Sequence, residues 1–567
     1  MSSFHLVAQT PENTVLTQYD PILRQATSYQ SEADLEKEFL YLLQEQGYEY
    51  LPIHSEDDLI INLRQSLEAL NNYTFTDSEW DRFFHQIIAN SNDTIEAKTQ
   101  RIQEDFIQAF EDDNGKTHNI KLIDKTNLPY NRLQVINQYA VEKKEGAKHD
   151  NRYDVTILVN GLPLVHIELK RRGVRLREAF NQIERYQRES FWAQSGLFNY
   201  VQIFVISNGT NTKYYSNTTR YNVSQENQKK GRRAKTSNSF EFTSYWADAN
   251  NQNITDLVDF TKTFFARHTL LNILTKYCVF TSEKTLMVMR PYQITATERI
   301  LNRIEMANSY KKYGSIEGGG YIWHTTGSGK TLTSFKTALL ATSLPYIDKV
   351  LFVVDRKDLD YQTIKEYDRF KKGAANSNSS TAILKAQLED PNAKIIITTI
   401  QKLSSFIKKN KHHPVYQQHL VFIFDECHRS QFGEMHQSII KNFKNYHLFG
   451  FTGTPIFADN SVKAKTSFLT TQQAFGDQLH SYTIINAIND KNVLPFHVEY
   501  HKTMKSDEEM EDEEVWDINR SKALMDPERI SKITSHILKT FWQKTYQNDK
   551  AYAIRALTNI SEVIEKG

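Results

Sequence analysis

A glycine-rich segment, residues 324–331, constrains the fold of this chain more than any other feature of its sequence. It reads HTTGSGKT and follows the apolar residues 321–323. A glycine-rich turn between a strand and a helix points successive backbone N–H groups inward, and with the helix N-terminus these groups attract phosphate oxygens. The segment therefore predicts a phosphate-binding loop that joins a buried strand to a helix.

The residues of this loop have separate expected roles in binding ATP. Lys330 is expected to place its charge on the β- and γ-phosphates, and Thr331 to place its hydroxyl on Mg²⁺. His324 stands where many such loops begin with glycine, at a position that mainly shapes the turn. The other nucleotide-binding residues of the loop are Thr326, Gly327, Ser328 and Gly329.

A second motif, further along the chain, indicates the same chemistry. The apolar residues 422–424 lead directly into Asp425 and Glu426. Asp425, at the end of a buried strand, is expected to hold Mg²⁺, and Glu426 to orient and deprotonate the attacking water. An ordinary strand-to-helix turn would explain the loop alone, but the two motifs together predict nucleotide hydrolysis with ATP and Mg²⁺ as cofactors.

The composition is that of a large protein without a marked surplus of charge. A chain of 567 residues, 39% of them hydrophobic, predicts about three or four domains. The formal net charge is +1, so any surface that binds nucleic acid must be local. Cys278 and Cys427 lie far apart without metal-site spacing, which indicates neither disulfides nor zinc. Because no signal sequence or long apolar run is present, we expect a cytoplasmic protein with no membrane partner.

The second half of the chain has the pattern of an α/β fold. After residue 290, four apolar segments alternate with helical patterns, which predicts a parallel sheet covered on both faces. These segments are residues 349–355, 394–399, 419–425 and 447–452. The expected fold class is therefore α/β.

The N-terminal half begins with an irregular segment that leads into a predicted helix. Residues 1–28 are expected to form an arm, and a helix is expected to begin after Ser31, a suitable N-cap. The apolar stripe of that helix consists of Leu35, Phe39, Leu42 and Leu43.

Two segments of the chain are strongly charged. The basic residues 221–239 are either a solvated insertion or a contact to DNA phosphates, and the acidic residues 506–514 are most simply a solvated loop.

Residues 152–170 predict a β-hairpin around an Asn-Gly turn. Apolar residues occupy the odd positions of both strands, and polar residues the even ones. The polar set is Asp154, Thr156, His166, Glu168 and Lys170. A plain two-residue turn would pair Asp154 with Ile167 and send one apolar set outward. We therefore expect a three-residue loop or a bulge, which would set Asp154 opposite Glu168.

Two adjacent carboxylates with a lysine beside them suit phosphodiester hydrolysis. Asp154 and Glu168 would hold a divalent metal that activates water, while Lys170 assists the attacking or leaving oxygen. Gln182 and Tyr186 follow at i and i+4 of a predicted helix, where they could reach the same site or the DNA backbone. The alternative for this hairpin is a charged face exposed to solvent.

The order of these motifs resembles the restriction (R) subunit of type I restriction-modification enzymes over essentially the whole chain. The motifs that carry the resemblance are, in order, Asp154…Glu168-x-Lys170, Gln182-x₃-Tyr186, Arg290-Pro291-Tyr292-Gln293, residues 324–331, Val353-Val354-Asp355-Arg356, Thr398-Thr399-Ile400-Gln401, Asp425-Glu426-Cys427-His428 and Thr452-Gly453-Thr454. Single motifs of this set range from weak to strong, whereas their joint order is highly specific.

The resemblance implies a PD-(D/E)xK nuclease joined to a superfamily 2 motor with RecA-like lobes. The nuclease residues that it implies are Asp154, Glu168 and Lys170, with Gln182 and Tyr186 in a supporting motif. An N-terminal helix of such nucleases usually adds an acid, for which Glu32 is the first choice and Glu36 the second. Gln293 falls where the glutamine of the family reads adenine. Asp355-Arg356 and Thr399 fall in segments that touch the tracked strand.

The resemblance also implies a division into domains. The expected parts are an arm at 1–28, the nuclease domain at 29–275, the first RecA-like lobe at 276–490, and a linker with the incomplete start of a second lobe at 491–567. Nothing after Thr454 matches the arginine motif of a second lobe. We therefore expect an N-terminal fragment or truncated subunit that binds ATP·Mg²⁺ but hydrolyses it slowly.

The function implied is ATP-driven translocation of double-stranded DNA, followed by Mg²⁺-dependent cleavage distant from the recognition site. The implied partners are the methyltransferase (modification) and specificity subunits, and no helix-turn-helix or zinc-finger signature is evident in this chain. Two alternatives are a helicase or remodelling motor without nuclease activity, and a truncated, non-catalytic DNA-binding or assembly module.

Overall fold

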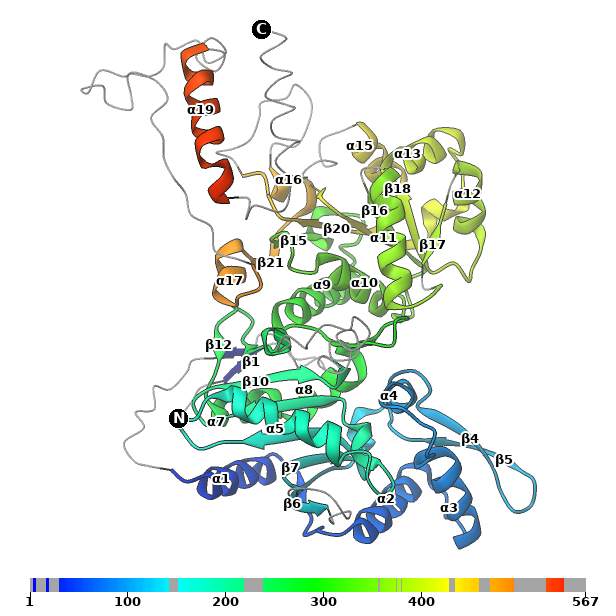
Figure 1. Cartoon of the computed structure of the whole chain (residues 1–567). Coiled ribbons are helices and arrows are strands. Elements are labelled where there is room, and N and C mark those ends of the chain that lie inside the picture. Colours follow the sequence, from blue (N-terminus) through cyan, green and yellow to red (C-terminus); the bar gives the residue numbers. More distant parts are fainter. Residues whose placement is uncertain are drawn as a thin grey trace. The chain divides into compact units, whose positions relative to one another are not determined.

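The computed structural model contains two main sheets, each flanked by helices (Figure 1). It describes residues 4–6, 17–19, 30–141, 151–218, 238–354, 357–373, 375–378, 380–427, 434–457, 470–493 and 527–544. Residues 1–493 form one compact unit and residues 494–567 a second one, whose described element is α19 (Pro527–Lys544). Within the described ranges, no helix has the length and apolar character needed to cross a membrane.

A six-stranded mixed sheet is the framework of the N-terminal part. Its strand order is β10-β9-β8-β7-β6-β3, in which β8 is parallel to β9 and β6 to β3, while the other neighbours are antiparallel. The strands are β3 (Glu49–Tyr50), β6 (Leu133–Val141), β7 (Asn151–Val159), β8 (Leu162–Leu169), β9 (Ile203–Ser207) and β10 (Thr212–Ser216). All of β8 and all of β7 except Arg152 is buried, so this hairpin is central to the domain.

Helices and small hairpins surround this sheet. The helices are α1 (Glu32–Glu45), α2 (Glu56–Asn71), α3 (Asp77–Phe83), α4 (Ile95–Gln103), α5 (Leu176–Glu189), α7 (Leu257–Phe264) and α8 (Arg267–Asn272). The two-stranded pairs are β1 (Phe4–Leu6) with β2 (Thr17–Tyr19), β4 (Ile107–Glu111) with β5 (Thr117–Lys121), β11 (Trp246–Ala247) with β12 (Asn253–Ile254), and β13 (Cys278–Phe280) with β14 (Leu286–Val288). The pair β1–β2 lies within the segment that we expected to be an irregular arm.

Helix α1 begins where its sequence predicts. Ser31 is the N-cap, and it forms a capping box with Asp34. The predicted stripe is buried at Leu35, Phe39 and Leu43, whereas Leu42 is only partly buried. Glu36 is buried on the same face, so the side of α1 that meets the sheet includes a carboxylate.

The register of the β7–β8 hairpin contains the predicted bulge. The turn has two residues, Asn160 and Gly161, with φ angles of 53° and 82°. The pairing then shifts, so that Ile157 faces Val165 but Leu158 faces Pro163, and Leu164 is left between them. Continued by one residue beyond the pair Val155–Ile167, this register places Asp154 opposite Glu168.

A seven-stranded parallel sheet forms the second framework. Its order is β17-β18-β16-β19-β20-β15-β21, and every pairing is parallel, as the alternating pattern predicts. The strands are β15 (Gly320–His324), β16 (Lys349–Val354), β17 (Asn376–Ser377), β18 (Ile395–Thr399), β19 (His419–Phe424), β20 (Asn445–Thr452) and β21 (Gln478–Tyr482). The helices are α9 (Pro291–Ser309), α10 (Lys330–Ala341), α11 (Lys357–Phe370), α12 (Thr381–Glu389), α13 (Ile400–Lys409), α15 (Glu434–Asn442), α16 (Thr471–Phe475) and α17 (Ile484–Asn489).

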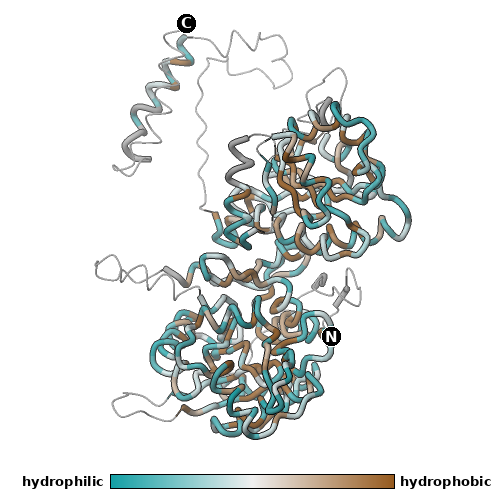
Figure 2. Tube along the Cα trace, turned by 90° about the vertical axis from the view of Figure 1, so that its right-hand side faces the viewer, coloured by the Kyte–Doolittle hydropathy of each residue, from teal (hydrophilic) through white to brown (hydrophobic). Residues whose placement is uncertain are grey.

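Both faces of this parallel sheet are covered. Phe352 and Ile423 point to the cluster that includes Phe335 of α10, while Leu351 and Phe422 belong to a separate cluster with α12, α13 and α15. In Figure 2 the apolar (brown) segments run mainly through the interior and the hydrophilic (teal) segments along the outside. Strands buried on both faces require near-continuous apolar runs, which is why their sequences predicted them.

One carboxylate in this core lacks hydrogen-bond partners. Glu298, on α9, is fully buried, and neither of its carboxylate oxygens has a partner among the described residues. Burial raises the pKa of Glu298 to about 8, from an ordinary value of 4.5. Between pH 4.5 and about 8, Glu298 therefore keeps its proton in the folded protein, whereas in the unfolded chain it has released it.

We expect Glu298→Gln to make the protein more resistant to alkaline pH. Stability from the protonated Glu298 is fully present below pH 4.5 and is lost as the pH rises towards 8, so the glutamine should raise Tm at pH 8 and leave it nearly unchanged at pH 5. The gain at pH 8 should be roughly 1 °C for each kcal/mol of relieved burial cost, because Glu298 belongs to the large compact unit of residues 1–493. Thermal unfolding followed by circular dichroism measures this, with Glu178→Gln, at an exposed position of α5, as control. An equal change in Tm at both pH values would contradict the expectation.

Candidate functional site

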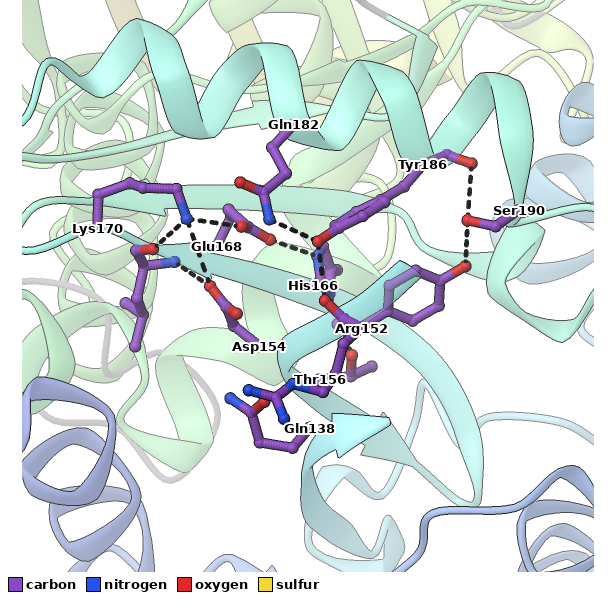
Figure 3. A network of polar contacts seen from close by, with 12 residues as sticks. Gln138, Arg152, Asp154, Thr156, His166, Glu168, Lys170, Gln182, Tyr186 and Ser190 are labelled. Carbon is purple, nitrogen blue, oxygen red and sulfur yellow. Dashed lines mark hydrogen bonds and ion pairs between the residues drawn. The ribbon is translucent and has the colours of Figure 1, made fainter. Parts of the chain in front are cut away.

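The β7–β8 hairpin brings together the acids and the lysine of the predicted nuclease motif (Figure 3). Lys170 Nζ donates a hydrogen bond to Glu168 Oε1 at 2.9 Å and lies 4.0 Å from Asp154 Oδ2. Asp154 Oδ2 also accepts a hydrogen bond from the backbone N–H of Leu169 at 2.9 Å. Glu168 is fully buried and Asp154 nearly so, which contradicts the alternative of a charged face exposed to solvent.

The two candidate acids of α1 occupy different places. Glu32 Oε1 lies 3.3 Å from Lys170 Nζ, at the edge of the cluster. Glu36 accepts hydrogen bonds from Asn137 Nδ2, at 2.6 Å, and from Gln138 Nε2, both on β6. Of the two, Glu32 is thus the acid in contact with the nuclease cluster, while Glu36 links α1 to the sheet.

Burial raises the pKa of both carboxyl groups in the cluster. Burial is the main cause for Asp154, and the neighbouring Glu168 adds to it. Burial also raises the pKa of Glu168, against the opposing effect of Lys170. Burial would lower the pKa of Lys170, but the attraction of Glu168 and Asp154 raises it overall, so the lysine stays charged. Such a pair of acids gains most from a bound divalent cation, which compensates both negative charges.

The residues of the cluster fit Mg²⁺. This ion is commonly bound by one or two carboxylates together with waters and substrate phosphates, and Asp154 and Glu168 are two buried carboxylates that both lie within 4.0 Å of Lys170 Nζ. No three His, Cys, Asp or Glu side chains in the described ranges are grouped so as to hold a metal ion. Cation binding by Asp154 and Glu168 stays a prediction, as does a role of Glu32 as a further metal ligand.

The two predicted supporting residues on α5 contact each other. Gln182 Nε2 donates to the Tyr186 hydroxyl at 2.6 Å, and that hydroxyl donates to the backbone carbonyl of Arg152 at 2.8 Å. Tyr186 is buried, and its hydroxyl anchors α5 to β7. Gln182 is half-buried, so it is the more accessible residue of the pair, and its contact with a substrate stays a prediction.

The glycine-rich segment forms the predicted loop between β15 and α10. Gly327 and Gly329 have φ angles of 78° and 76°, in the left-handed region that favours glycine. Ser328 Oγ donates to the carbonyl of Thr325 at 2.6 Å, which closes the turn. Gly329 precedes the first residue of α10, so the backbone of the loop leads directly into a helix N-terminus. Thr326, Gly327 and Gly329 are exposed, as a phosphate site requires.

The Asp-Glu motif lies beside the lysine of this loop. Glu426 Oε1 is 3.5 Å from Lys330 Nζ, and a Cβ at Gly453 would lie 3.7 Å from the same nitrogen. Burial, with Glu426 adjacent to it, raises the pKa of Asp425 to about 6. Thr331 follows Lys330 in the first turn of α10 and is half-buried. These residues fit an Mg²⁺–triphosphate, in which Thr331 and Asp425 would hold the cation.

Gln293 forms a hydrogen bond to the backbone of the glycine-rich loop. Its Oε1 accepts from the backbone N–H of Arg290 at 2.9 Å, and its Nε2 donates to the carbonyl of Ser328 at 3.1 Å. The Tyr292 hydroxyl donates to the same carbonyl at 2.8 Å. Recognition of adenine by Gln293 stays a prediction, although a cavity of about 660 Å³, large enough for a nucleotide, opens beside it.

Sequence reasoning missed the far wall of this cavity. Besides the loop residues, it is lined by residues of the N-terminal part, from β10, the segments that follow it, and β14. They include Tyr215, Ser216, Thr218, Phe242 and Leu286. These residues lie far from the loop in sequence, and no local motif marks them, so only the tertiary structure reveals them.

The remaining motif residues have structural roles or lie outside the described ranges. His324 is buried and its Nε2 lies 2.9 Å from His480 Nδ1, which agrees with a residue that shapes the turn and binds little. Thr399 is buried as the N-cap of α13, with its hydroxyl accepting from the N–H of Lys402, and contact of its segment with a tracked strand stays a prediction. Asp355-Arg356 and His428 are outside the described residues, as are most of the basic residues 221–239 and all of the acidic residues 506–514.

Two models of protein families match the chain. The model described as "Type I restriction enzyme R protein N terminus" matches residues 29–223, which contain the nuclease cluster. The model described as "SWI2/SNF2 ATPase" matches residues 292–529, which contain the loop and the Asp-Glu motif. The two matches thus correspond to the two sites.

Curated relatives match over long stretches. Over 300 residues the chain is 48% identical to the type I restriction enzyme EcoprrI endonuclease subunit of Escherichia coli, which covers 53% of this chain and 90% of that protein. Over 548 residues it is 38% identical to the type I restriction enzyme SsaAORF53P endonuclease subunit of Staphylococcus saprophyticus, covering 95% of this chain and 54% of that one. The chain thus spans about half the length of the second relative.

A solved structure also matches, but too weakly to support an argument. It is titled "ATP-dependent Type ISP restriction-modification enzyme LlaBIII bound to DNA". The match covers 37% of this chain and 16% of that chain, at 19% identity and a TM-score of 0.28.

Lys330→Ala should weaken nucleotide binding. Removal of a charged donor to the phosphates is expected to lower the affinity for ATP roughly 10- to 100-fold, because hydrogen bonds to charged groups contribute about 1.5–3 kcal/mol. Titration with a fluorescent ATP analogue in Mg²⁺ measures this. Lys408→Ala, on an exposed helical surface, should bind as the parent does. Unchanged affinity in Lys330→Ala would show that the loop does not hold the phosphates.

Proposed function

The chain belongs to the family of type I restriction enzyme endonuclease subunits, and we propose that it uses ATP to translocate double-stranded DNA and Mg²⁺ to cleave it. Cleavage would take place at a distance from the recognition sequence, where translocation stops. A methyltransferase subunit and a specificity subunit would complete the enzyme and recognise the DNA sequence. The protein would act in the cytoplasm, where these partners and the DNA are found.

The observation that carries this proposal is the buried cluster of Asp154, Glu168 and Lys170. It occurs in the same compact unit as the contact between Lys330 and Glu426. A motor without nuclease activity has no need of two adjacent buried carboxylates, which are costly to bury unless a cation or a proton compensates them. The combination therefore favours a nuclease driven by a motor over a motor alone.

In the nuclease centre, each residue has a separate task. Asp154 and Glu168 would hold the divalent ion, which when bound supplies charge neutralisation and an activated water. Lys170 Nζ, within 4.0 Å of both carboxylates, stabilises the negative charge that develops on the phosphate oxygens. Tyr186 holds α5 against β7, and Gln182 is positioned to contact the substrate.

In the motor, the same division of tasks applies to the nucleotide. The backbone N–H groups of residues 326–329 and Lys330 Nζ would bind the β- and γ-phosphates, while Thr331 and Asp425 would hold the Mg²⁺ that accompanies ATP. Glu426 is positioned to orient the attacking water and take its proton. Its contact with Lys330 at 3.5 Å would be replaced by the γ-phosphate when ATP binds.

Asp154→Asn should abolish DNA cleavage and leave ATP hydrolysis intact. In the enzyme assembled with its partner subunits, we expect cleavage of a plasmid with recognition sites to fall roughly 100-fold or more, because charge compensation in the centre is lost. DNA-stimulated phosphate release should match that of the parent, since residues 324–331 and Asp425 are unaffected.

The control for this experiment is Asp57→Asn, an exposed aspartate in the first turn of α2. It should cleave and hydrolyse as the parent does. Normal cleavage by Asp154→Asn would exclude the nuclease assignment and leave a motor alone. Loss of ATP hydrolysis together with cleavage would show that the two sites are not separate.

A further inference from the structure

His166 lies directly behind the nuclease cluster, on the same face of β8 as Glu168 (Figure 3). Its side chain is fully buried. Four aromatic rings surround the imidazole, with centroid distances between 5.6 and 6.3 Å, and they belong to Tyr153, Tyr186, Phe191 and Phe204. Because water is excluded from this place, the polar atoms of the imidazole depend on partners within the protein.

Two buried polar atoms face each other in this environment. His166 Nε2 lies 3.6 Å from Glu168 Oε2, just beyond hydrogen-bond length. Neither atom has a hydrogen-bond partner within the described ranges. The other carboxylate oxygen of Glu168, Oε1, already accepts from Lys170 Nζ. Catalytic hydrogen bonds are often long in the free enzyme and shorten when the ligand binds. A small shift would therefore bring His166 Nε2 and Glu168 Oε2 within hydrogen-bond distance.

Thr156 contacts the other imidazole nitrogen, Nδ1. It stands opposite His166 in the hairpin register, and its Oγ1 lies 3.1 Å from His166 Nδ1. A hydroxyl can donate to a neutral imidazole nitrogen. If Thr156 donates to Nδ1, the ring proton of the neutral imidazole is on Nε2, the nitrogen that faces Glu168.

We propose that His166 is a positioning residue of the nuclease centre, whose neutral imidazole donates from Nε2 to Glu168 Oε2 when the divalent cation binds. This bond would fix the direction of the carboxylate, so that Oε1 stays beside Lys170. The inference rests on the proposed nuclease function, because it assigns Glu168 to cation binding. Groups that orient a metal ligand in this way typically change metal affinity roughly 10- to 100-fold when they are removed.

The test is cation binding by the full chain in the absence of nucleotide. Calorimetric titration with Mn²⁺ compares the parent with His166→Leu, His166→Gln and Asp154→Asn. We expect His166→Leu to raise the Kd for Mn²⁺ roughly 10- to 100-fold. His166→Gln, whose side-chain amide can donate from nearly the place of Nε2, should bind close to the parent value. Tm from thermal unfolding shows whether each variant is folded.

Two outcomes would overturn the inference about His166. One is parental affinity in His166→Leu while Asp154→Asn has lost Mn²⁺ binding. The other is an equal loss of affinity in His166→Leu and His166→Gln at unchanged Tm, which would mean that only the shape of the ring matters. Undiminished Mn²⁺ binding by Asp154→Asn is distinguishable from both, because it would remove the proposed nuclease site itself and this inference with it.

Thr156→Val gives a second test that does not depend on the folding of His166→Leu. Valine keeps the volume of threonine and removes the hydroxyl that directs the ring proton. We expect a Kd for Mn²⁺ between those of the parent and His166→Leu, since the proton is then free to occupy either nitrogen. An affinity equal to that of the parent would contradict the role given to Thr156 and to the Nε2 proton.

Discussion

The bulge at Leu164 is the constraint on which the buried cluster of Asp154, Glu168 and Lys170 depends. Side chains of a strand alternate between faces, so a shift of one residue between β7 and β8 decides whether Asp154 meets Glu168 or Ile167. The turn before the bulge is fixed by close packing, because a Cβ at Gly161 would lie 2.5 Å from the Cα of Leu63. Both faces of the hairpin are buried, which removes water from the carboxylates and makes a compensating cation favourable.

The motor depends on a different constraint, the common direction of its strands. In a parallel sheet the carboxyl ends of all strands meet at one edge, and ligands bind there. The loop after β15, Asp425 and Glu426 after β19, and Gly453 after β20 are therefore neighbours although they are far apart in sequence. Seven parallel strands, with β20 between β19 and β15, are what bring Lys330 to Glu426.

The nucleotide cavity links the two parts of the first compact unit. Gln293 and the loop form one wall, and residues such as Tyr215 and Thr218, next to the nuclease sheet, form the other. The nuclease centre is on β7 and β8 of that same sheet, which β9 joins to β10. The cavity beside the glycine-rich loop and the cluster of Asp154, Glu168 and Lys170 are therefore built on frameworks that share a cavity wall.

The sequence by itself determined the loop, the Asp-Glu motif, the parallel sheet and the need for a bulge between Asp154 and Glu168. Each of these follows from local chemistry: glycines at left-handed positions, apolar runs of strand length, and a period of two residues. Only the tertiary structure decided that Glu32 rather than Glu36 contacts Lys170, that Tyr186 is buried, and that His166 faces Glu168. These facts depend on how α1 and α5 pack on the sheet, and packing between distant segments has no period in the sequence from which it could be predicted.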